Sequence, residues 1–121
     1  MALIFNMSMF PKVKFSINSL VSVNKKQKIV VGYAYVDGEI IYVLSPDVTY
    51  KDKDLEYSKE PDLKLVTNPE KEFVTKYSMG DKTNSTEYIG GILRTSNGEN
   101  VLYFLTNTEF EPETIQWIEI E

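Results

Sequence analysis

The stretch that decides the fold spans residues 29–44 and reads IVVGYAYVDGEIIYVL. On each side of the dipeptide Asp37-Gly38 it is a run of β-branched and aromatic residues, which is typical of β-strands. Asp-Gly is a preferred pair for a tight hairpin turn, because both central residues of that turn need positive φ. We therefore expect residues 29–36 and 40–44 to form a β-hairpin.

The same pattern recurs about 60 residues further along the chain. Residues 89–93 and 101–105 repeat the two strands, and Asn97-Gly98 repeats the turn inside a longer loop. Two shorter blocks also match, namely KFSINS at 14–19 with KYSMGD at 76–81, and Val31-Gly32 with Ile89-Gly90. Blocks that recur in the same order indicate two copies of one β module; chance similarity between β-rich segments is the alternative.

The remaining segments fit an all-β chain. Each copy is expected to open with a strand at its KFS or KYS block and to close with a strand after a Pro-acid pair, at residues 61–66 and 112–120. Gly32 and Gly90 fall inside strands, where glycine usually marks a bulge or a sharp bend. Residues 68–74 are read as part of the linker, although Asn68 and Pro69 would suit the start of one helical turn.

This order of strands and turns resembles the SH3-like small barrels of bacterial and phage proteins. The first copy keeps the residues of that pattern, which are Phe15, Val21, Val31, Gly32, Asp37, Gly38, Tyr42 and Val43. It departs at Asn18-Ser19, where the family usually has Gly-Asp; the second copy has Gly80-Asp81 but then Lys82-Thr83 in place of an apolar position. The resemblance, which covers most of residues 12–118, supports fold far more than function.

What the resemblance implies is a pair of tandem SH3-like barrels. The first barrel with its N-terminal arm would occupy residues 1–66, a linker residues 67–75, and the second barrel residues 76–121. The arm is apolar around Leu3-Ile4-Phe5. We expect it to cover one end of a barrel, with dimerisation as the alternative, so the chain is expected to be a monomer or a homodimer.

Composition narrows the function. The 121 residues contain no His and no Cys, which removes the commonest general base, the commonest transition-metal ligand and the thiol nucleophile. We therefore expect no enzymatic activity, no cofactor and no metal site. The sequence contains no apolar run near the roughly 20 residues that a membrane-spanning helix needs, and its start does not read as a secretory signal. We expect no membrane association and a cytoplasmic location.

Charge is unevenly distributed along the chain. Residues 1–36 contain five Lys and no acidic residue, whereas residues 37–121 contain all 18 acidic residues, so the net charge of -5 hides a basic start. The block KKQK contributes Lys25, Lys26 and Lys28 to this start. These lysines would either contact phosphate or form a solvated hairpin tip, and the acidic net charge and the single Arg favour the solvated tip.

An insertion at residues 47–60 distinguishes the first copy and is the first candidate for partner contact, since elongated loops often carry function. The candidate partner-binding residues are Tyr50, Asp52, Asp54, Glu56, Tyr57 and Glu60. The spacing of Asp52, Asp54 and Glu56 raises calcium binding, but the Gly and the Glu that an EF-hand loop requires are missing. A solvated loop is the favoured reading. A tyrosine groove is a further hypothesis, with packing against the sheet as the favoured alternative; its members would be Tyr33, Tyr35, Tyr42, Tyr50 and Tyr57.

These features favour a non-enzymatic protein-binding module. The compact, Lys-, Asn- and Ile-rich chain resembles accessory proteins of phages and mobile elements. That resemblance implies an inhibitor or adaptor that acts on a host protein, such as a nucleic-acid-handling or defence protein, in the host cytoplasm. Its acidic surface would contact a basic partner. Direct nucleic-acid binding through the basic N-terminal half, and a structural role in an assembly, are the alternatives.

Overall fold

The computed structural model describes residues 12–36, 39–83, 88–98, 100–106 and 117–120. Within them the chain is built of β-strands and two 3-10 turns, which confirms the expected all-β class. The strands are β1 (Leu20–Val23), β2 (Lys26–Val36), β3 (Glu39–Ser45), β4 (Glu56–Lys59), β5 (Lys64–Thr67), β6 (Tyr88–Arg94) and β7 (Val101–Thr106). The 3-10 turns are Asp52–Asp54 and Glu60–Asp62. The described segments contain no helix long and apolar enough to cross a membrane.

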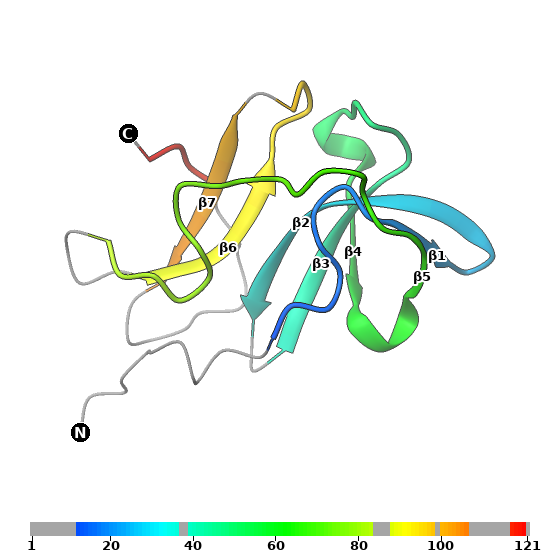
Figure 1. The fold of residues 1–121 in the computed structure, drawn as a ribbon, viewed down its shortest axis with the longest axis horizontal. Helices are drawn as coiled ribbons and strands as arrows, with labels where there is room; N and C mark the ends of the chain where they lie inside the picture. The colour runs from blue at the N-terminus through cyan, green and yellow to red at the C-terminus, as the bar shows by residue number, and fades with distance from the viewer. Residues whose placement is uncertain (1–11, 37–38, 84–87, 99, 107–116, 121) are drawn as a thin grey trace.

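The strands form one antiparallel sheet that continues from the first half of the chain (residues 12–67) into the second half (residues 76–120). The path β4-β3-β2-β1-β5 lies in the first half, while β6 pairs with β2 and β7 pairs with β6 (Figure 1). The long strand β2 makes this junction. Residues 26–29 pair with β1, and residues 32–34, beyond a register shift, pair with β6.

The two predicted hairpins are confirmed. Strand β2 pairs with β3 up to Val36 opposite Glu39, and β6 pairs with β7 up to Arg94 opposite Val101. The dipeptide Asp37-Gly38, predicted to form the first turn, lies outside the described residues. In the longer second loop, Gly98 has the positive φ (76°) that such a turn requires.

A bulge interrupts each hairpin near the predicted glycine. The register shifts between Val30 and Gly32 in β2, and between Ile89 and Gly91 in β6. The residue that corresponds to Gly32 is therefore Gly91. The sequence match of Val31-Gly32 with Ile89-Gly90 was wrong by one residue, because the bulge absorbs a residue that simple alternation does not count.

The two halves repeat around the β2–β6 junction. Tyr33 lies opposite Ile92, and Gly32 and Ala34 lie opposite Leu93 and Gly91. Gly32 corresponds to Gly91. On one side of Tyr33–Ile92 the glycine is therefore in β2, and on the other side the equivalent glycine is in β6. The register thus defines a local two-fold relation centred on that pair.

The opening blocks of the two halves also make the same contacts. Asn18 N donates to Val30 O at 2.7 Å, and Gly80 N donates to Ile89 O at 2.8 Å. Neither block is a strand, contrary to the prediction. Asn18 (φ 76°) and Gly80 (φ 87°) have left-handed backbones, which turn the chain before a strand can extend. In the first half the strand begins only at Leu20.

Two equivalent tyrosines hold these opening blocks against the sheet. The ring of Tyr42 packs edge-on against Phe15, and the ring of Tyr103 packs edge-on against Tyr77, at centroid distances of 5.2 and 5.4 Å. The Tyr42 hydroxyl accepts hydrogen bonds from Lys14 N (2.8 Å) and Phe15 N (3.3 Å). The Tyr103 hydroxyl accepts one from Tyr77 N at 3.4 Å.

The predicted closing strands and linker are altered in detail. Strand β5 follows a 3-10 turn at Glu60–Asp62 and pairs with β1. In the second half the described part of the closing segment makes a single bridge, from Ile118 to Tyr103, and residues 112–116 lie outside the described chain. Residues 68–74 form no helical turn. Instead Phe73 packs against the core of the second half.

Three apolar clusters form the core. The first lies in the first half around Val21, Val30 and Tyr42, and the second lies mainly in the second half around Ile89, Ile92 and Tyr103. Tyr33 and Met79 contact both clusters. The third cluster joins Val31 and Val43 to Leu93. The halves therefore share apolar contacts as well as a sheet.

A candidate binding pocket at the junction of the two halves

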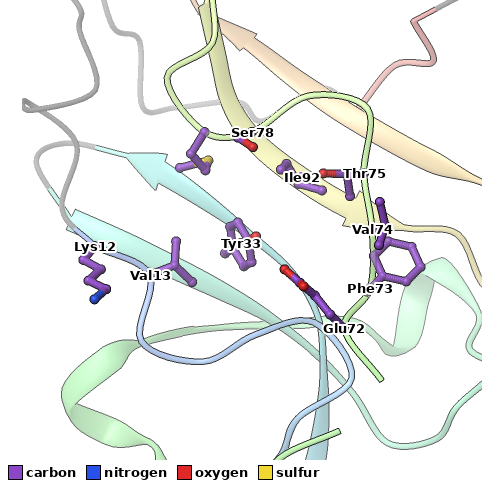
Figure 2. Close-up of a pocket in the computed structure, with 10 residues that line it drawn as sticks. Lys12, Val13, Tyr33, Glu72, Phe73, Val74, Thr75, Ser78 and Ile92 are labelled. Atoms are coloured by element: carbon purple, nitrogen blue, oxygen red, sulfur yellow. The ribbon is translucent and has the colours of Figure 1, made fainter. Parts of the chain in front are cut away.

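A cavity of about 540 Å³ lies at the junction of the two halves. We call it the seam pocket; its walls are Lys12, Val13, Tyr33, Glu72, Phe73, Val74, Thr75, Ser78, Met79 and Ile92. Figure 2 shows the side chains of Tyr33 on β2 and Ile92 on β6 between the linker and the start of the first half. The pocket therefore sits at the two-fold centre of the sheet.

The linker supplies one whole wall of this pocket. Residues 72–75 pass beside it, with Phe73 half-buried in the core of the second half and Val74 80% exposed. The hydroxyl of Thr75 donates to Tyr77 O at 2.6 Å, which fixes the chain where the linker enters the second half. The segment predicted to be a simple connection is thus part of the candidate site.

The pocket combines apolar walls with polar groups. Val13, Phe73 and Ile92 are apolar, while Lys12 and Glu72 bring opposite charges. Burial raises the pKa of Tyr33, and the nearby Tyr42 and Glu72 raise it further. The Tyr33 phenol therefore remains neutral at physiological pH and offers a hydroxyl among apolar side chains. Such a mixture of apolar walls and a few polar groups is typical of binding sites.

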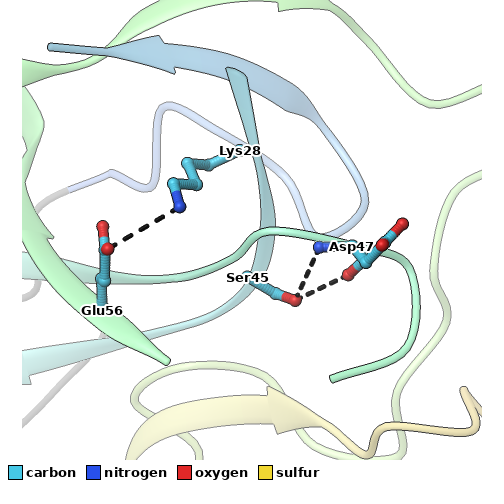
Figure 3. Close-up of polar contacts among 4 residues, drawn as sticks. All are labelled: Lys28, Ser45, Asp47 and Glu56. Atoms are coloured by element: carbon cyan, nitrogen blue, oxygen red, sulfur yellow. Dashed lines mark hydrogen bonds and ion pairs between the residues drawn. The ribbon is translucent and has the colours of Figure 1, made fainter. Parts of the chain in front are cut away.

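The insertion at residues 47–60 is more ordered than the favoured solvated loop. It begins with a turn in which the Ser45 hydroxyl donates to Asp47 O (2.6 Å) and accepts from Asp47 N (3.2 Å), as Figure 3 shows. It continues through the 3-10 turn Asp52–Asp54 into β4, which pairs with β3. Half of the predicted loop is therefore turn and edge strand.

Tyr50 fastens this insertion to the second half. Its backbone N donates to the Ser96 hydroxyl at 2.8 Å, and that hydroxyl donates to Tyr50 O at 2.7 Å. The Tyr50 hydroxyl donates to Arg94 O. Tyr50 also packs against the third core cluster. The structure therefore places this candidate partner-binding residue in an internal contact.

The other candidate residues of the insertion do not form one surface. Asp54 is exposed, Glu60 is partly buried, and the side chain of Asp52 lies outside the described part. Tyr57 is 49% exposed, and its hydroxyl accepts a hydrogen bond from Trp117 Nε1 at 3.4 Å. Within the described residues, no three carboxylate-bearing residues are grouped so that they could hold a metal ion.

The predicted lysine cluster is divided by an ion pair. Lys25 and Lys26 are exposed at the β1–β2 turn, where Asn24 and Lys25 have positive φ (51° and 65°). Lys28 Nζ instead lies 3.7 Å from Glu56 Oε1, and its side chain is largely buried (Figure 3). Two residues that were assigned to different sites therefore contact each other, and only two of the three lysines face solvent.

The proposed tyrosine groove also breaks up. Tyr42 is fully buried, and Tyr33 packs against both main core clusters, as the packing alternative predicts. The seam pocket itself was missed, because its walls come from five separate segments of the chain. The apolar Phe73-Val74 pair inside an otherwise polar linker was the signal that could have pointed to it.

Comparisons with protein-family models, with curated proteins and with solved structures find no match for this chain.

Proposed function

We propose that the chain is a non-enzymatic protein-binding module and that the seam pocket receives an apolar side chain of its partner. The observation that carries this proposal is the pocket itself, in which both halves and the linker meet. Its volume of about 540 Å³ is ample for one large side chain, and buried anchors of this kind dominate the energy of most protein interfaces. Lys12 and Glu72 would orient the partner around the anchor.

A basic partner suits the charge of the chain. The net charge is -5, and Glu70 and Glu72 are both exposed in the linker beside the pocket. Complementary charge would speed association and would make it sensitive to salt. An inhibitor or adaptor that acts on a basic host protein, such as a nucleic-acid-handling protein, fits this arrangement.

We also propose that each half is an SH3-like barrel. The path β4-β3-β2-β1-β5, with a 3-10 turn between β4 and β5 and a long bent β2, supports an SH3-like barrel in the first half. The equivalent bulge, tyrosine and opening turn support a related unit in the second half. Barrels of this type serve as protein-binding modules in many settings, so the fold is compatible with the function but does not select it.

Photo-crosslinking tests the proposal. A photoreactive phenylalanine at Val74, on the exposed rim of the pocket, should capture a protein partner from a bacterial lysate. The same group at Val66, which is exposed on β5 away from the pocket, is the matched control. Ser78→Trp, which fills the pocket from an exposed position, should abolish capture at position 74.

Repeating the crosslinking at high salt tests the expected charge of the partner. Raising salt from about 0.1 M to about 1 M shortens the Debye length from roughly 10 Å to roughly 3 Å, and capture of a basic partner should weaken strongly. Equal capture from positions 74 and 66, or capture that Ser78→Trp leaves unchanged, would contradict the assignment of this pocket.

A further inference from the structure

The most unusual polar group in the described chain is Arg94, its single arginine. It ends β6 and is only 4% exposed. Its Nη1 donates to Thr95 O at 3.2 Å, whereas Nε and Nη2 are buried without a hydrogen-bond partner. Buried donors in folded proteins nearly always have an acceptor, and a buried cation normally has an anion beside it. The Nε–Nη2 edge of this guanidinium is therefore a position where a bound acceptor would be stabilised.

The described ion pairs do not supply that anion. They join Lys28 to Glu56 and Lys59 to Glu39, and neither involves Arg94. Burial lowers the pKa of Arg94, and the neighbouring Tyr50 opposes this effect only in part. An arginine nevertheless keeps its charge at neutral pH, so the positive charge persists in this buried position.

A cavity of about 300 Å³ lies beside this side chain, and its lining includes Arg94 itself, Asn18, Thr49, Asn97 and Gly98. Gly98 places the charged end of Arg94 at this cavity, since a Cβ added there would lie 3.7 Å from Nη1. Thr49 and Asn18 are further polar residues in the lining. The cavity is separate from the seam pocket, with which it shares only Phe73.

We propose that this cavity is a carboxylate-binding site in which the Nε–Nη2 edge of Arg94 holds both carboxylate oxygens. The two N–H groups of that edge are parallel and match a carboxylate in a bidentate pair. A monoanion neutralises the single guanidinium, whereas a phosphate dianion would leave excess negative charge in a chain whose net charge is already -5. The Nε–Nη2 edge is buried in this structure, and the group near Gly98 is Nη1, so binding requires the side chain to turn until that edge faces the cavity. The carboxylate comes from a free acid or from an acidic side chain of a bound protein.

The single arginine allows a direct NMR test on the whole chain. The spectrum of the labelled protein contains one Nε–Hε signal of an arginine, so any ligand of this edge is read without assignment of the rest. Sodium acetate represents a free acid, and N-acetylglutamate amide represents a protein side chain. We expect either probe to move the Hε signal downfield to saturation. Inorganic phosphate at the same ionic strength should bind at least about threefold more weakly.

Variants and salts separate this site from general effects. Thr49→Trp fills the cavity from an exposed position. It should weaken acetate binding about tenfold, which is an increase of about one decade in Kd. Val66→Trp, on the exposed strand β5, is the matched control and should leave binding unchanged. A shift no larger than that caused by sodium chloride, or an equal shift in Thr49→Trp, would overturn the proposal.

One internal competitor needs its own control. Glu99 follows Gly98 in the sequence, so Glu99→Gln is compared with the parent in the absence of any added acid. An unchanged Nε–Hε signal and retained acetate binding support a site for an external carboxylate. A large change of that signal without added acid would show that the chain's own glutamate occupies the edge, and would overturn the proposal.

Discussion

Tyr33 of β2 lies directly opposite Ile92 of β6, and both side chains line the seam pocket. The centre about which the two halves repeat is thus also the place where the pocket is built. Any change that separates these two strands should alter the stability of the sheet and the shape of the pocket together. The glycines beside the pair are the most direct way to test this.

Gly32→Ala should destabilise the protein by about 1–3 kcal/mol, the usual cost of overpacking a close contact, or prevent folding. A Cβ at this position would lie 2.5 Å from Ile92 O and 2.9 Å from Leu93 Cα, which are backbone atoms that cannot rotate away. Gly91→Ala should cost somewhat less, because its closest contacts are 2.9 Å. Urea denaturation measures both values.

Gly98→Ala is the control for these two substitutions. Its Cβ would meet only Arg94 Nη1 at 3.7 Å, so the cost is that of a positive φ (76°), about 1 kcal/mol. If Gly32→Ala lowers the free energy of unfolding no more than Gly98→Ala does, β2 and β6 do not approach each other as closely as described.

Tyr42→Phe should cost about 1–3 kcal/mol, because it leaves the N–H groups of Lys14 and Phe15 without their buried acceptor. Tyr103→Phe is the matched substitution in the second half. It removes a single, longer hydrogen bond from Tyr77 N and should cost less. Chemical denaturation of the two variants side by side gives the comparison, and an equal loss would show that the two hydroxyls contribute alike.

Alkaline pH should weaken the fold through its buried phenols. The pKa values of Tyr33 and Tyr42 are raised, in both cases mainly by burial. Above pH 10 the unfolded chain loses these protons before the folded chain does, so the free energy of unfolding falls as pH rises. Below pH 10 both states keep the protons, and this contribution is fully present.

Tyr33→Phe should make the free energy of unfolding fall less steeply as pH rises above 10. It removes one raised pKa while keeping the ring that packs against both core clusters. Tyr57→Phe, in which the ring is half exposed, is the control. The measurement is the free energy of unfolding between about pH 8 and pH 11, a range that spans the ordinary tyrosine pKa near 10. A slope that Tyr33→Phe leaves unchanged would contradict the burial of this phenol.

The Lys28–Glu56 ion pair should contribute only about 0.2–1 kcal/mol, since Glu56 is largely exposed. A double-mutant cycle with Lys28→Met and Glu56→Gln measures it. The Lys59–Glu39 pair is shorter, at 3.2 Å, but both of its side chains are exposed. High salt should therefore weaken the Lys59–Glu39 coupling more than the Lys28–Glu56 coupling, and the reverse order would place Lys28 at the surface.

The hairpins could be predicted from sequence because the signal for them is local. Strand runs on either side of Asp37-Gly38 specify which two segments pair. The opening blocks could not be read correctly, since a single left-handed residue, Asn18, ends the extended path there. The one-residue error at Gly90 has the same origin, because a bulge breaks the alternation on which the alignment depends.

Sites formed between distant segments were beyond sequence reasoning. The seam pocket needs Val13, Tyr33, Phe73 and Ile92 to meet, and nothing in their spacing predicts that. The insertion at 47–60 was predicted to distinguish the first half, and its counterpart at 107–116 lies outside the described residues. Its charged spacing, however, concealed that Tyr50 fastens it to Ser96 and that residues 56–59 extend the sheet. The burial of Arg94 left no trace in the sequence.

The β2–β6 junction has the geometry of an isologous interface, in which each partner offers the same patch to the other. Joining both halves in one polypeptide removes the need for the two sides to stay identical. The aromatic Tyr33 can then lie opposite the aliphatic Ile92. A single linker also passes on one side of the two-fold centre and has no symmetry-related copy. The seam pocket is therefore inherently asymmetric, and the partner that we propose for it would dock in a single orientation.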